Sequence, residues 1–147
     1  MHLPKPLNAS HEALRATLKR AMREPGKAGE AARRIASIAA GHFLREEKYV
    51  HPLLAVLPSL ARGESGIAAA DAVQLLDKLE SEIHQMIADH REISEGLREL
   101  AGAPSANGGD GYAAFAEEFI VHAHIEEEVL YPAALVAGRY IKKLLGE

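Results

Sequence analysis

Apolar residues recur at every third or fourth position over four stretches of this chain, which is the spacing of one face of an α-helix. Nowhere do apolar and polar residues alternate for long enough to form a β-strand. Turn-forming residues separate the stretches near residues 24–26, 58–66 and 102–111. We therefore predict an all-α protein, an antiparallel up-down four-helix bundle, with helices over about 8–23, 28–57, 69–101 and 112–145.

The second and fourth predicted helices each contain one proline, Pro52 and Pro132. Because proline has no N–H to donate to the helical ladder, we expect both helices to bend there. In the second helix, Tyr49 is expected to be a core residue. In the fourth, the inward stripe is expected to run through Phe115, Phe119, His122, Glu126, Val129, Ala133 and Val136.

Each predicted helix carries a histidine on its apolar stripe, namely His11, His42, His90 and His122. A buried polar side chain costs about 1–3 kcal/mol unless a partner satisfies it. A lone inward histidine is usually a hydrogen-bonded core residue. Four of them, one on each helix, point to a shared partner.

Two of these histidines begin the same pattern. His42 and His122 are each followed by glutamate four and five residues later and by proline ten residues later. From the composition, a given histidine would meet these conditions in roughly one case in 1,500. Residues four apart lie one turn apart on the same helical face, so each imidazole can converge with its carboxylate, Glu46 or Glu126.

The composition limits which metal ligands and which classes of partner are possible. The chain has no cysteine, so any metal must be held by nitrogen and oxygen. Scattered basic residues and a net charge of −4 argue against a nucleic-acid partner. No apolar run approaches the roughly 18–20 residues of a membrane span, and the N-terminal residues lack a signal-peptide core. We expect one cytoplasmic domain over residues 1–147, with no membrane partner.

Imidazole suits iron, zinc and copper, whereas carboxylates favour harder ions and can bridge two of them. The bundle interior is therefore expected to collect four imidazoles and two carboxylates, a dinuclear metal site in the core. Manganese or zinc would also fit this donor set. The predicted metal ligands are His11, His42, Glu46, His90, His122 and Glu126.

This pattern, from His11 to Pro132, resembles the hemerythrin-like, or HHE cation-binding, family. The resemblance implies a four-helix bundle with two non-haem iron ions, bridged by Glu46, Glu126 and an oxo group. It also implies dioxygen, peroxide or small anions as partners at the metals. A sensor of this kind would signal through a homodimer or a separate signalling partner.

The chain departs from the oxygen-carrying members in two places. Those proteins have two histidines one turn apart on the third helix, but Met86 and Ser94 lie four residues before and after His90. One imidazole is thus missing, which favours reaction with peroxide over reversible oxygen carriage. Those proteins also use an aspartate five residues after the fourth-helix histidine, where this chain has Glu127, but Glu126 has the better helical spacing.

Five other histidine and glutamate residues lie near the pattern. Glu47 and Glu127 either accept an imidazole N–H or are simply solvated, and we favour the solvated interpretation. His84 and His124 are expected on the surface. His51, which precedes Pro52, is expected to pack rather than to bind metal.

Three functions remain open from the sequence. The first is a diiron protein that binds or senses oxygen, peroxide or iron. The second is a catalase-like enzyme that removes peroxide at the same centre, so the sequence leaves open whether the protein is an enzyme. The third is a metal-free helical interaction domain, whose two inward carboxylates would then need raised pKa values or full hydrogen bonding.

Overall fold

The structure is a computed structural model that describes residues 5–64, 69–104 and 111–146. These residues form helices and no strand, so the predicted all-α fold is confirmed. In chain order the elements are α1 (Lys5–Ala21), α2 (Gly26–Arg45), the π-helical turn η1 (Glu46–Val50), α3 (His51–Ala55), α4 (Leu57–Ala61), α5 (Ala69–Gly102), α6 (Ala113–Ile125), the π-helical turn η2 (Glu126–Leu130) and α7 (Tyr131–Leu144). None of these helices is both long enough and apolar enough to cross a membrane.

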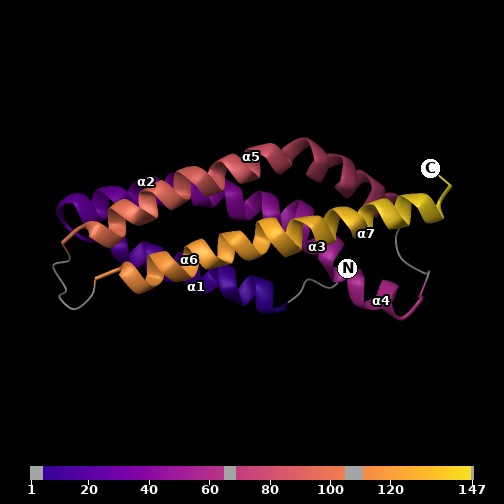
Figure 1. Cartoon of the computed structure of the whole chain (residues 1–147), viewed down its shortest axis with the longest axis horizontal. Helices are drawn as coiled ribbons and strands as arrows, with labels where there is room; N and C mark the ends of the chain where they lie inside the picture. Colours follow the sequence, from indigo (N-terminus) through magenta and orange to yellow (C-terminus); the bar gives the residue numbers. More distant parts are fainter. Residues whose placement is uncertain (1–4, 65–68, 105–110, 147) are drawn as a thin grey trace.

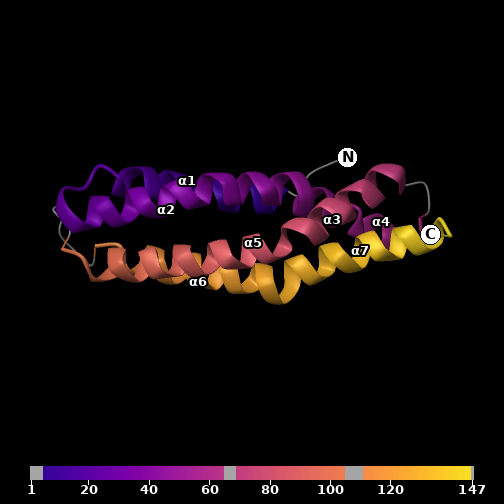
Figure 2. The same ribbon diagram turned by 90° about the horizontal axis from the view of Figure 1, so that it is seen from above.

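The long helical segments form an elongated bundle in which each segment runs antiparallel to the one before it (Figure 1). Seen from above, α1 and α2 form one layer, and α5 with α6 and α7 forms the other (Figure 2). Helix α5 packs against α2 across the layers and against α6 and α7 within its own. This order agrees with the predicted up-down topology.

In the second and fourth helical segments, a π-helical turn ends two residues before the proline, η1 before Pro52 and η2 before Pro132. The N–H of His51 bonds to the carbonyl of Glu46, and the N–H of Tyr131 bonds to the carbonyl of Glu126, five residues back in each case. A proline ring clashes with the carbonyl four residues before it in a regular helix, and the wider turn accommodates that ring. The sequence thus predicted where the helices change but not how.

The π turns rotate every residue that follows them. One extra residue per turn shifts the helical face by about 100° relative to a regular α-helix. Val129, inside η2, and Val136, after it, were predicted on the inward stripe but are exposed by 56% and 62%. That part of the predicted stripe is wrong, and the buried positions are Tyr131, Ala134 and Ala137.

Two apolar clusters lie on either side of the predicted ligands along each long segment. One cluster includes Ile35, Ile93 and Phe119, and the other includes Leu53, Met86 and Tyr131. In sequence, the residues between them are the polar ones of the HxxxE patterns and His90. The fold therefore encloses a polar layer within an apolar interior.

Candidate metal centre

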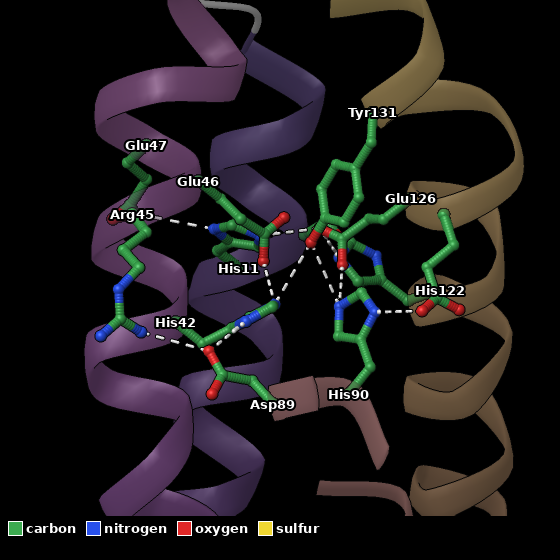
Figure 3. A network of polar contacts seen from close by, with 12 residues as sticks. His11, His42, Arg45, Glu46, Glu47, Asp89, His90, His122, Glu126 and Tyr131 are labelled. Carbon is green, nitrogen blue, oxygen red and sulfur yellow. Dashed lines mark hydrogen bonds and ion pairs between the residues drawn. The ribbon is translucent and has the colours of Figure 1, made fainter. Parts of the chain in front are cut away.

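The six predicted ligand residues meet in this polar layer (Figure 3). His11 comes from α1, His42 from α2, His90 from α5 and His122 from α6, while Glu46 and Glu126 are the first residues of the two π turns. Five of the six are at most 3% exposed, and the side chain of His122 is 15% exposed. Four helical segments thus each contribute to one buried cluster.

The four imidazoles turn their Nε2 atoms toward the two carboxylates. His42 Nε2 lies 2.6 Å from Glu46 Oε1. His90 Nε2 lies 3.0 Å from Glu126 Oε1, and His122 Nε2 lies 3.1 Å from Glu126 Oε2. His11 Nε2 lies between the carboxylates, 3.8 Å from Glu46 Oε2 and 3.6 Å from Glu126 Oε2.

The donor atoms fall into overlapping groups, each compact enough to hold one metal ion. His42, Glu46, His90 and Glu126 form the first group, in which all donor atoms lie within 4.8 Å of one another. His11 and His122 form a second group with Glu126, and His11 forms a third with Glu46 and His51. Because both carboxylates belong to more than one group, each is positioned to bridge two ions.

Six buried nitrogen and oxygen atoms in this cluster have no hydrogen-bond partner. They are both ring nitrogens of His11, both carboxylate oxygens of Glu46, and Nδ1 of His51 and of His90. An unsatisfied buried polar atom costs about 1–3 kcal/mol. His42 Nε2 and Glu46 Oε1 lie 2.6 Å apart, so one ion could contact both atoms. The residues therefore fit a bound cation pair.

The two carboxylates have opposite electrostatic environments. Burial and the adjacent Glu126 raise the pKa of Glu46 well above its ordinary value. Burial alone would also raise the pKa of Glu126, but the Glu46 carboxyl and the imidazoles of His11, His122 and His90 outweigh it and hold this pKa well below the ordinary value. Because two adjacent buried carboxylates do not both ionise readily, a metal ion would displace the proton that the pair shares without a cation.

Burial also keeps the neighbouring groups neutral. The pKa of His42 falls to about 4, chiefly because the ring is buried and His90 is near. Its Nδ1–H donates to Asp89 Oδ2 at 3.1 Å, so its Nε2 lone pair is left for a metal. Burial and the nearby carboxylates raise the pKa of Tyr131, so its hydroxyl stays protonated.

An outer residue faces the Nδ1 atom of each of the four imidazoles. Asp89 holds His42, and the Ser10 hydroxyl lies 3.1 Å from His122 Nδ1. Glu47 lies 3.7 Å from His11 Nδ1, and Glu127 lies 3.5 Å from His90 Nδ1. Glu47 also accepts two hydrogen bonds of 2.9 Å from Arg15. Both glutamates are part-buried beside the imidazoles, so the solvated interpretation favoured from the sequence does not describe them.

Sequence reasoning missed two residues of the cluster. His51 is 1% exposed and lies beside His11, with ring centroids 5.0 Å apart. Tyr131 places its hydroxyl 3.4 Å from His42 Nε2 and 3.2 Å from His90 Nε2 (Figure 3). Both stand nine residues after the histidine of their pattern, about 180° round a regular helix. The proline at the tenth position was the signal in the sequence that could have revealed the turn.

The structure shows what stands where the oxygen-carrying proteins have a second histidine on the third helix. Met86 is fully buried in an apolar cluster, and Ser94 is half-buried. His84 and His124 are exposed, which confirms their prediction as surface residues.

A helical bundle that buries overlapping imidazole and carboxylate groups has the architecture of a cation-binding domain. The model of the hemerythrin HHE cation-binding domain matches residues 3–134, and the chain belongs to this family. The resemblance seen in the sequence is thereby confirmed. No curated protein and no solved structure matches the chain.

Proposed function

We propose that this protein binds two iron ions between Glu46 and Glu126 and uses them to bind or sense dioxygen, peroxide or a related small anion. The observation that carries the proposal is the convergence of four imidazole Nε2 atoms on two buried carboxylates. In a layer enclosed by apolar clusters, only a cation would satisfy that many donors at once.

In the proposed arrangement, His42 and His90 hold one ion, and His11 and His122 hold the other. Glu46 and Glu126 contact both ions, because each carboxylate belongs to more than one donor group. When bound, a ferrous pair supplies the electrons that dioxygen or peroxide accepts. Family membership and the nitrogen and oxygen donors favour iron, although the same donors accept manganese or zinc.

The outer residues keep the imidazoles ready to bind. Asp89 and Ser10 fix the rings of His42 and His122 through their Nδ1 atoms. Glu47 and Glu127 place negative charge behind His11 and His90, which favours a metal cation in front of them. These contacts set which nitrogen of each ring faces the metals.

Small molecules have a short route to the centre between α1 and α6. A groove of about 360 Å³ follows this boundary, and its lining includes Ser10, Leu14, Phe115 and His122. His122 is the most exposed of the six proposed ligands. The groove is therefore the proposed entry for ligands of the size of dioxygen, peroxide or azide.

The test is the metal content and visible spectrum of protein purified from iron-supplemented cells. We expect about two irons per chain and a charge-transfer band that moves when azide is added. His42→Ala and Glu126→Ala should lose most of the iron, and His124→Ala, with its exposed side chain, should keep it. A folded wild-type protein that takes up no metal, even on reconstitution, would overturn the proposal.

A catalase-like activity is the second candidate, favoured by the apolar Met86 one turn before His90. With methionine in place of histidine at that position, the ion held by His42 and His90 would have one imidazole fewer and could bind peroxide. Oxygen evolution from peroxide should vanish in His42→Ala and Glu126→Ala but survive in His124→Ala. Iron-loaded wild-type protein that evolves no oxygen would rule out the enzyme and leave binding or sensing.

The metal-free interaction domain is the least favoured of the three functions. A purely polar network would have to satisfy its own buried atoms, but His11 and Glu46 have no hydrogen-bonded side-chain atom in the described cluster.

A further inference from the structure

His51 is buried beside the proposed metal pair with a free donor atom. Its Nδ1 is fully buried and has no hydrogen-bond partner. The ring lies at 37° to that of His11, and one of its two nitrogens is within 4.8 Å of donor atoms of His11 and Glu46. A core histidine that serves only to pack would leave this nitrogen unsatisfied, at a cost of about 1–3 kcal/mol.

The π turn η1 brings His51 to this place. In a regular helix, a residue nine positions after His42 lies about 180° from it, on the far side. The extra residue of the turn moves His51 by about 100° toward the face that carries Glu46. The backbone N–H of His51 bonds to the carbonyl of Glu46, so the same turn fixes both side chains.

We propose that His51 is a fifth imidazole ligand, bound to the ion that His11 and His122 hold. The proposal rests on the proposed function, because it requires the metal pair. It replaces the histidine that the third helix lacks at Met86 with one from the second helical segment. The donor set then comprises five imidazoles and two carboxylates.

The fifth ligand makes the two ions unequal. With His51 as a ligand, three imidazoles and both carboxylates would hold one ion, and two imidazoles and both carboxylates would hold the ion near His42 and His90. A small ligand would therefore find more open positions on the second of these ions. The hydroxyl of Tyr131, 3.4 Å and 3.2 Å from the Nε2 atoms of His42 and His90, stands beside that ion to donate a hydrogen bond.

The test uses cobalt(II) as the probe metal, because each cobalt-bound imidazole gives one strongly shifted ring N–H proton signal. We expect five such signals from the wild-type protein loaded with two cobalt ions. His51→Gln should lose one of them and weaken binding of one cobalt ion at least tenfold, while the other ion stays bound. His84→Gln, on the surface of α5, is the control and should change neither quantity.

The outcomes separate the two proposals. Wild-type protein that binds two cobalt ions with only four N–H signals would overturn the fifth ligand and leave the proposed function intact. Wild-type protein that binds no cobalt would overturn the proposed function itself. Because the signal count is made on the wild-type protein, it decides the matter even if His51→Gln does not fold.

Discussion

Asp89 offers a sharp test of how the centre is held. Its carboxylate is buried between α2 and α5, and it accepts hydrogen bonds from His42 Nδ1 at 3.1 Å, Arg45 Nη1 at 3.1 Å and Gln85 Nε2 at 2.9 Å. Asp89→Ala removes all three acceptor contacts. The ring of His42 then loses the group that keeps its Nε2 lone pair directed at the metal.

The expected loss follows from these contacts. A buried imidazole N–H left without an acceptor costs about 1–3 kcal/mol. Removing an outer carboxylate from a metal-bound histidine lowers metal affinity by about 10–100-fold, equivalent to about 1.4–2.8 kcal/mol. The two ranges agree. Asp89→Asn keeps one acceptor oxygen and should lose less than Asp89→Ala.

The assay is an anaerobic iron(II) titration against a competing chelator of known affinity. Asp89→Ala should weaken binding of the ion that His42 and His90 hold, and it should leave the affinity for the other ion unchanged. Glu82→Ala is the matched control, because Glu82 Oε2 also contacts Arg45, at 3.4 Å, but not His42. An Asp89→Ala variant that folds normally and binds both ions within twofold of the wild-type affinity would refute the reasoning.

Three further predictions concern packing, surface histidines and metal removal. A Cβ at Gly96 would lie 2.6 Å from Ile35 Cγ1, so Gly96→Ala should lower the free energy of unfolding by about 1–3 kcal/mol. A Cβ at Gly41 would meet only Arg45, at 3.8 Å, so Gly41→Ala should raise this free energy by about 0.5–1 kcal/mol. Urea unfolding measures both changes. The reverse order would show that α2 and α5 do not pack as described. His84→Ala should leave iron content unchanged by elemental analysis, and a loss would contradict its exposed position. Removal of the metal with a chelator should lower the melting temperature, because metal at 100 times its dissociation constant stabilises the fold by about 2.7 kcal/mol. Equal melting temperatures for the metal-loaded and chelated protein would contradict a metal site in the core.

The fold and six cluster residues were predictable because both follow from helical periodicity. Apolar spacing gave the bundle, and the four-residue spacing from His42 to Glu46 and from His122 to Glu126 gave the inward pairs. The histidine of each pair lies in the last turn of α2 or α6, and the glutamate is the first residue of the π turn that follows. Regular geometry therefore holds as far as the two carboxylates.

The residues after the carboxylates were not predictable from regular periodicity. Each π turn rotates the following face, which buries His51 and Tyr131 and exposes Val136. A proline predicts a disturbed helix, but not whether the helix bends or widens. Asp89 was missed for another reason, because its role depends on a distance between two helices that no spacing in one helix encodes.

The most direct test of the central claim is anomalous diffraction at the iron absorption edge from crystals of the iron-loaded protein. We predict two peaks about 3.5–4 Å apart between Glu46 and Glu126, one beside His42 and His90 and the other beside His11 and His122. A single peak in this layer, or peaks only at the surface of the bundle, would contradict the account of a buried dinuclear centre.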